Sequence, residues 1–281
     1  MPNKIEFFKE AENANLKAKP IIKWAGGKSQ ILIEILKYVP ADFNRYIEPF
    51  IGGGAVFFAL NHPNCIISDL NEELVNMYIQ IRDNVDEVID ILNSYINNEQ
   101  VYYQIRALNP NNLLEVERAA RLIFLNKTCF NGLYRVNKKG EFNVPYNKRS
   151  GAFFNAQLLH IASRFLSNTE ILHGDYKSIL ESNAEPDDFI FLDPPYHPIS
   201  EYSDFKRYTK EFFYEKDQIE LAEYFVELVK LGCIVILTNS NHPFVLDLYK
   251  DFHIEVVQSK RLISSNPNTR FGEDIIVIGG Y

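Results

Sequence analysis

The sequence predicts an α/β protein organised around a parallel or mixed β-sheet. Short apolar runs typical of buried strands recur along the chain, and helical patterns lie between several of them, as at residues 28–39 and 216–231. Strands that alternate with helices in this way are joined by right-handed crossovers, which place the helices against the faces of the sheet. The expected strands lie at residues 45–50, 64–70, 169–175, 188–193, 232–240, 253–259 and 273–280.

The stretch from residue 76 to residue 165 interrupts this alternation. Its patterns are mostly helical and surround one hairpin signal, whose arms are residues 132–136 and 141–146. The NKKG segment between the arms ends in a glycine, which can supply the positive φ that such a turn requires. We therefore expect one sheet domain, formed by residues 1–75 and 166–281, with residues 76–165 inserted into it.

The composition of the 281 residues is that of an ordinary globular protein, with 46% hydrophobic and 23% charged residues. No apolar run approaches the roughly 18 residues that a membrane span needs, and the N-terminal segment is too polar to hold a signal-peptide core. Cys65, Cys129 and Cys233 are widely spaced and form neither a disulfide framework nor a zinc pattern. We therefore expect a cytoplasmic protein with no membrane segment and no metal site.

Positive charge is concentrated in two segments of a chain whose net charge is −8. Residues 126–150 contain six basic side chains against Glu141 alone, and residues 259–270 contain three basic side chains and no acid. Basic segments on an acidic body are typical of a directed site for a polyanion. Solvated surface loops have the same composition, so charge alone leaves both interpretations open.

A glycine-rich segment, EPFIGGGAVFFAL, follows one expected strand and opens a helix. Its three successive glycines, beginning at Gly52, allow the backbone to turn tightly and to approach a ligand. Asp69 ends the next expected strand near the distance typical of an acid that binds ribose hydroxyls, whereas Phe57 replaces the third glycine of a dinucleotide fingerprint. These features favour a nucleoside ligand over a pyrophosphate. The alternative is a tight turn beside a solvated Asp69.

The segment KWAGGKS at residues 23–29 is not a phosphate-binding P-loop. That motif needs a further glycine at position 22, where the chain has Ile22, and a strand before it. Without the motif, Lys28 could be a solvated lysine at a helix start and Trp24 a core residue.

The expected strand at 188–193 ends in the sequence Asp-Pro-Pro-Tyr. Because proline fixes φ and lacks an N–H, the two prolines stop the strand and hold the backbone rigid. Ligands of open α/β sheets bind just beyond the carboxyl ends of the strands. At that position Asp193 offers a carboxylate, Pro194 a carbonyl oxygen and Tyr196 an aromatic face.

These three groups suit an aromatic amine such as N6 of adenine. That nitrogen is a poor nucleophile because its lone pair is delocalised into the ring, and two acceptors that each take one N–H would direct the lone pair at an electrophile. A nucleoside that carries a methyl sulfonium, bound at the glycine loop, fits the role of electrophile, with positioning and hydrogen bonding as the catalytic resources. An adenine inside a duplex would have to flip out, at a cost on the order of a few kcal/mol.

The chain resembles the adenine-N6 DNA methyltransferases of the Dam type. The similar segments follow the order of that family along nearly the whole chain: KWAGGK, EPFIGGGAV, SDLN, NGLYRVNKKGEFNVPY, DPPY and SSNPNTR. The resemblance implies a seven-stranded mixed sheet of the class I methyltransferase type with helices on both faces, and a mostly helical target-recognition insertion that carries a β-hairpin. It also implies S-adenosylmethionine as the cofactor and double-stranded DNA as the substrate, most often at GATC.

The resemblance assigns site residues in three groups. The cofactor would be bound at its methionine side by Trp24, Ala25, Gly26, Lys28, Phe50, Gly52 and Gly54, at its ribose by Asp69, and around its adenine by Asp175 and Tyr176, with Asp193 at the edge of this site. The target base would be held by Asp193, Pro194, Pro195 and Tyr196. Bases would be read by Lys23, Leu133, Arg135 and Pro145, the space left by the flipped adenine would be filled by Phe130 and Asn131, and Asn137 would also contact the DNA. The DNA backbone would be contacted by Arg261, Ser264, Ser265, Asn266 and Arg270.

Several alternatives remain at this level. Related enzymes that read GATATC carry a similar hairpin, and residues 147–150 depart from the usual family sequence after NVPY. A methyltransferase that acts on RNA adenine or on a protein amide would use a related strand-end motif, usually with Asn in place of Asp193, and need not carry a basic hairpin. A DNA-binding protein that has lost catalysis would tolerate damage in the DPPY pocket. Whether a cognate restriction endonuclease accompanies the protein is not encoded in these residues.

Overall fold

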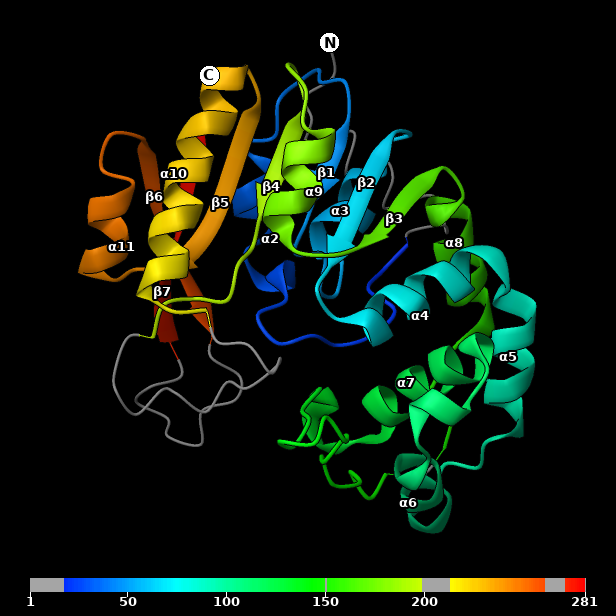
Figure 1. Cartoon of the computed structure of the whole chain (residues 1–281). Helices are drawn as coiled ribbons and strands as arrows, with labels where there is room; N and C mark the ends of the chain where they lie inside the picture. Colours follow the sequence, from blue (N-terminus) through cyan, green and yellow to red (C-terminus); the bar gives the residue numbers. More distant parts are fainter. Residues whose placement is uncertain (1–17, 150, 199–212, 261–270, 281) are drawn as a thin grey trace.

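The computed structural model describes residues 18–149, 151–198, 213–260 and 271–280. Its centre is a seven-stranded sheet with the order β3-β2-β1-β4-β5-β7-β6 (Figure 1). The first five strands in that order are parallel, and β7 lies antiparallel between β5 and β6. The strands are β1 (Tyr46–Glu48), β2 (Cys65–Asp69), β3 (Thr169–His173), β4 (Phe189–Leu192), β5 (Ile234–Ser240), β6 (His253–Lys260) and β7 (Phe271–Gly279). The predicted mixed sheet and all seven predicted strands are confirmed.

The helices begin where the sequence carries capping side chains. Asn71, Asn98, Asn155 and Asp175 each accept a hydrogen bond from a backbone N–H in the first turn of the helix that follows. The helices are α2 (Leu32–Leu36), α3 (Ala55–Leu60), α4 (Glu72–Asp83), α5 (Val85–Ser94), α6 (Glu99–Ala107), α7 (Glu115–Thr128), α8 (Ala156–Leu166), α9 (Tyr176–Asn183), α10 (Glu215–Leu231) and α11 (Pro243–Leu248), with 3₁₀ turns at Lys28–Gln30, Pro110–Asn112 and Phe130–Gly132.

Both faces of the sheet are covered, which explains why β4 is apolar at every position. Phe189 and Phe191 point into a core shared with α2 to α8, whereas Ile190 and Leu192 point into a second core shared with α9, α10 and α11. All four side chains are fully buried. Successive residues of a strand face opposite sides, so a strand covered on both sides has no polar face.

The helices between β2 and β3 share the core on one face of the sheet. Buried residues of α4, α5, α7 and α8 belong to the same cluster as the strand residues, so the hydrophobic core runs from the sheet into this part of the chain without a break. The expected boundary at residue 76 falls inside α4. The division into a sheet domain and an inserted unit stays a prediction.

The expected hairpin has its turn but not its strands. Gly140 has φ 81° and donates to the Asn137 carbonyl, yet the arms carry only two isolated bridges, Cys129–Tyr146 and Val136–Phe142. The ladder does not continue beyond Asn143, whose N–H donates to the Arg135 carbonyl over 3.0 Å, because the Pro145 carbonyl accepts from the Phe130 N–H over 2.8 Å. The residue after Val144 is a proline, which cannot donate to a ladder.

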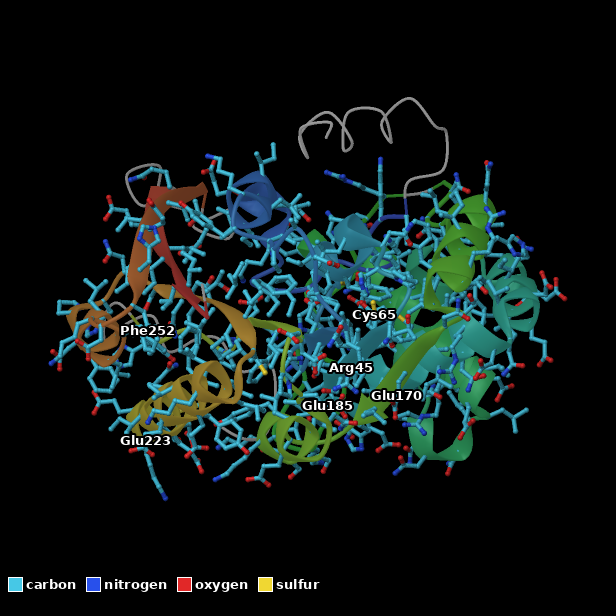
Figure 2. All side chains as sticks on the ribbon, turned by 90° about the horizontal axis from the view of Figure 1, so that it is seen from above. Arg45, Cys65, Glu170, Glu185, Glu223 and Phe252 are labelled. Atoms are coloured by element: carbon cyan, nitrogen blue, oxygen red, sulfur yellow. The ribbon has the colours of Figure 1, made fainter. Side chains whose placement is uncertain are left out.

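Figure 2 looks onto the edge of the sheet at which the parallel strands begin, where Arg45, Cys65 and Glu185 are labelled. Arg45 forms two hydrogen bonds with the buried carboxylate of Asp188, of 3.1 and 2.7 Å, and one to the Asn183 carbonyl. This bidentate pair ties the start of β1 to the start of β4 and leaves the opposite edge for ligands. In the described part of the chain, no helix is both long and apolar enough to cross a membrane.

Candidate active site

The carboxyl ends of β1, β2 and β4 lie side by side because these strands are parallel neighbours. The glycine loop follows β1, Asp69 ends β2 and Asp193 follows β4. The fold therefore brings the three chemical motifs of the sequence to one edge of the sheet, although they are far apart along the chain.

The glycine loop is held open in a conformation that side chains would obstruct. Gly52 has φ 45° and Gly54 has φ 69°, both in the left-handed region. A Cβ on Gly52 would lie 2.8 Å from Cδ1 of Trp24, so the indole packs directly on the loop backbone. The Gly52 N–H donates to Asp69 Oδ2 over 3.1 Å, and Tyr78 Oη donates to the Gly52 carbonyl over 2.9 Å.

Asp69 is a half-buried carboxylate that is oriented by backbone groups. Its Oδ2 accepts from Gly52 and its Oδ1 accepts from the Asn71 N–H over 2.9 Å. Burial raises the pKa of Asp69 to about 6, and the backbone hydrogen bonds oppose that rise. The carboxylate can therefore accept hydroxyl groups of a ligand at neutral pH and loses its charge in mildly acidic solution.

Aromatic rings cover the edge next to the glycine loop. The rings of Phe50 and Tyr176 have centroids 5.2 Å apart, and the ring of Phe213 lies 6.4 Å from each of them. Asp175, the residue before Tyr176, caps α9 by accepting from the Lys177 N–H. These rings form one aromatic surface on which a nucleobase could stack.

Asp193 is held by two donors on the same oxygen. Its Oδ1 accepts from Lys28 Nζ over 2.6 Å and from Thr238 Oγ1 over 2.9 Å. Burial raises the pKa of the Asp193 carboxyl, while Lys28 and Thr238 act in the opposite direction. Lys28 also donates to the Gly26 carbonyl, and its ammonium lies 4.7 Å from the centre of the Tyr196 ring. The resemblance grouped Lys28 with the cofactor residues, whereas in the structure its ammonium forms an ion pair with the Asp193 carboxylate.

Two buried amides hold the backbone of the DPPY segment. Gln218 of α10 donates to the Pro195 carbonyl over 2.9 Å and accepts from Asn239 Nδ2 over 2.9 Å. Asn239 of β5 in turn accepts from the His197 N–H over 3.2 Å. No described residue donates a hydrogen bond to the Pro194 carbonyl.

Sequence reasoning missed four residues of this site. The polar end of β5, "TNS" after a run of apolar residues, was the available signal for Thr238 and Asn239, whereas nothing local distinguished Gln218. Glu48, in the glycine-loop motif, is buried, and one of its oxygens accepts from Tyr46 Oη over 2.7 Å and from the Phe57 N–H. Burial raises the pKa of Glu48 well above its ordinary value.

Of the described residues expected to meet DNA, the exposed Lys23 lies directly before Trp24, and the others lie at the end of α7 and on the hairpin. Phe130 is 53% exposed, and Asn131 lies next to it in the left-handed region with φ 57°. Leu133 is half-buried and Pro145 exposed. The side chains of the expected loop Arg261, Ser264, Ser265, Asn266 and Arg270 lie outside the described residues.

Two polar side chains of the hairpin have partners within it. Arg135 donates to Asn143 Oδ1 over 2.7 Å and to the Asn143 carbonyl over 3.2 Å. Asn137, expected to contact DNA, accepts from the N–H groups of Lys139 and Glu141 and donates to the Glu141 carboxylate. Asn137 therefore shapes the turn, whereas the guanidinium of Arg135 is bonded across the hairpin to Asn143 on the opposite arm.

The described residues contain no group of three His, Cys, Asp or Glu side chains arranged to hold a metal ion. Cys65, Cys129 and Cys233 are buried free thiols, and burial raises their pKa values. The groups at this edge of the sheet are carboxylate and carbonyl acceptors and aromatic rings, which suit an organic ligand.

The strand order, the glycine loop and the acid at the end of β2 define the fold class as that of class I methyltransferases. The family model of D12 class N6 adenine-specific DNA methyltransferases matches residues 24–263. The chain belongs to this family of enzymes.

Curated relatives agree with the family match. The chain is 41% identical over 278 residues to the Type II methyltransferase M.MjaIII of Methanocaldococcus jannaschii, covering 91% of this chain and 96% of that protein. It is 38% identical over 272 residues to the Type II methyltransferase M1.LlaDCHI of Lactococcus lactis subsp. cremoris, covering 94% and 95%. It is 32% identical over 279 residues to the DNA adenine methylase of Haemophilus influenzae, covering 97% of each.

Proposed function

We propose that the protein transfers a methyl group from S-adenosylmethionine to N6 of an adenine flipped out of duplex DNA, within GATC or a related short site. The observation that carries this proposal is the hydrogen bonding of the acceptor oxygens in the DPPY segment. Asp193 has both of its described hydrogen bonds on Oδ1, and the Pro194 carbonyl accepts from no described residue. Two acceptor oxygens on a rigid backbone are what an exocyclic amine with two N–H groups requires.

The residues of the chain supply positioning and charge. Lys28 and Thr238 hold Asp193 in one orientation, so that Oδ2 can accept one amine N–H while the Pro194 carbonyl accepts the other. During the transfer the amine nitrogen would gain positive charge, which the Asp193 carboxylate would stabilise until that nitrogen loses a proton to solvent. The ring of Tyr196 would stack on the flipped base.

The glycine-loop edge fits the cofactor, which would supply an electrophilic methyl group on sulfur. Asp69 would accept its ribose hydroxyls, and the glycine backbone under Trp24 would accommodate its methionine end. The adenine would lie on the aromatic surface of Phe50 and Tyr176. This arrangement is supported by the φ values of the loop and by the fixed orientation of the Asp69 carboxylate.

We expect cofactor affinity to depend on the charge of Asp69. Since the pKa of Asp69 is raised to about 6 and bound hydroxyl donors favour the ionised form, the affinity should fall as the pH drops through about 6. Asp69→Ala should raise the cofactor Kd by about tenfold to a hundredfold at pH 8, because a charged acceptor is worth roughly 1.5–3 kcal/mol. Calorimetric titrations at pH 8 and pH 5.5 measure both effects. Equal affinity of the variant and the wild type would show that Asp69 does not contact the cofactor.

We expect Lys28 to set the pH range of the reaction. Lys28 lowers the pKa of Asp193 against the effect of burial, so Lys28→Met should move the acidic limb of the kcat profile to higher pH. Lys28→Arg keeps the positive charge and should move the limb less. Single-turnover rates from pH 5 to pH 9 provide the profile, and an unshifted limb in Lys28→Met would mean that Asp193 is not the titrating group.

The decisive experiment for the proposed function is tritiated methyl transfer to matched duplexes that contain GATC, GATATC or neither, with an RNA duplex as a further substrate. Transfer restricted to one DNA duplex identifies the site. Transfer to RNA alone, or to none of these substrates, would overturn the proposal. Retention of labelled cofactor without transfer would indicate a binding protein that has lost catalysis.

A further inference from the structure

Asn126, in the last turn of α7, is fully buried and uses its amide to join two distant segments. Its Oδ1 accepts from the Lys23 N–H over 2.9 Å, and its Nδ2 donates to the Lys23 carbonyl over 2.8 Å. The same Nδ2 donates to the Gly132 carbonyl over 3.1 Å. One side chain therefore pairs with the backbone of Lys23 on both sides and with the end of the Phe130–Gly132 turn.

The first segment leads directly to the cofactor edge. Trp24 follows Lys23 in the chain, and its indole packs on the backbone of Gly52 while its Cβ lies beside Gly53. A ligand that enters the glycine loop must lie close to this ring. A displacement of Trp24 would move the backbone of Lys23, which the Asn126 amide holds on both sides.

The second segment carries the residues expected to meet DNA. Gly132 ends the turn that contains Phe130 and Asn131 and has φ 67°. A Cβ at Gly132 would lie 2.6 Å from Cδ of Lys23, so the turn backbone packs on that side chain. Further along the hairpin, the ring of Tyr134 stacks on Trp24 with a centroid distance of 4.9 Å and an angle of 24°.

We propose that Asn126 is a positioning residue that couples occupancy of the cofactor loop to sequence-specific DNA binding. This inference rests on the proposed function for the identity of both ligands. The buried amide of Asn126 makes three hydrogen bonds, which fix the position of Lys23 relative to Gly132. Any other relative position would leave the buried amide without some of these partners. Coupling of this kind is reciprocal, so each ligand must raise the affinity for the other by the same factor.

A buried amide with only a structural role makes a different prediction. Its loss would lower the melting temperature and weaken the binding of both ligands, but the factor by which one ligand raises the affinity for the other would not change. The coupling factor therefore distinguishes the two roles, whereas activity alone does not.

The experiment measures the Kd of a fluorescent duplex that contains the preferred site, by anisotropy, with and without saturating S-adenosylhomocysteine. The ratio of the two values is the coupling factor. The wild type should show a factor of roughly five or more, and Asn126→Ala should reduce it to about one. Asn126→Asp, which keeps the acceptor for the Lys23 N–H and loses both donated bonds, should also reduce it and serves if the alanine variant does not fold.

Asn76→Ala is the matched control. Asn76 is a buried asparagine of α4 that donates to the carbonyl of Glu115 at the other end of α7, over 2.9 Å, and its amide is not hydrogen-bonded to Lys23 or Gly132. This variant should keep the coupling factor of the wild type. A wild-type factor of one, an unchanged factor in both Asn126 variants, or an equal loss in Asn76→Ala would each overturn the proposal. Because the assay needs no turnover, a failure of methyl transfer by the wild type would overturn the proposed function separately.

Discussion

Asp193→Ala abolishes methyl transfer while cofactor and DNA binding stay within about tenfold of the wild type; this is the largest effect we expect from one substitution. The carboxylate acts on the reacting amine, so its loss removes an interaction made mainly in the transition state. Single-turnover transfer, together with binding titrations of the same variant, measures the result. Substantial turnover by Asp193→Ala would remove this residue from the mechanism.

The control for Asp193 must separate chemistry from folding. Alanine leaves the ammonium of Lys28, a residue only 5% exposed, without its carboxylate, and breaking a buried pair can cost about 3–5 kcal/mol. Asp193→Asn keeps the volume and should melt closer to the wild type. Because Lys28 and Thr238 both donate to the Oδ1 position, the amide oxygen must lie there and the NH₂ must face the target amine. A folded but inactive Asp193→Asn therefore supports the assigned geometry, and an active one contradicts it.

Arg135→Ala should relax sequence discrimination at one base pair and cost about 1–3 kcal/mol on the correct site. Arginine pairs bidentately with O6 and N7 of guanine in the major groove, and in the free protein the Arg135 guanidinium already adopts a fork geometry on Asn143. Methylation rates on the cognate duplex and on every single-base variant measure discrimination. A common decrease on all duplexes would mean that Arg135 holds phosphate.

Lys139→Ala is the matched comparison for Arg135. Lys139 lies in the exposed turn, where its backbone N–H is bonded to Asn137, and its ammonium should contact phosphate. Its loss should weaken binding to all duplexes by the same factor and reduce the salt dependence of binding. Selective loss at one base pair would instead place Lys139 at a base edge.

The arrangement of strands and helices could be predicted because it depends on local patterns. Apolar runs such as 188–193 and helical patterns such as 216–231 report burial and helix positions within a few residues of themselves. The hairpin was predicted less well, since the Leu133 N–H and the Pro145 carbonyl both bond to Phe130 instead of to each other. No local pattern records that competition.

The candidate site divides in the same way. By itself, the sequence determined the fold class, because strand and helix patterns alternate along the chain. It also determined the glycine loop, Asp69 and the DPPY segment, because each belongs to a short motif whose chemistry lies in adjacent residues. Only the tertiary structure placed Lys28 and Thr238 on one oxygen of Asp193 and joined Lys23 to Gly132 through Asn126. Asn126 lies 103 residues from Lys23. Such contacts depend on the packing of whole strands and helices, which decides which distant side chains come within hydrogen-bonding distance.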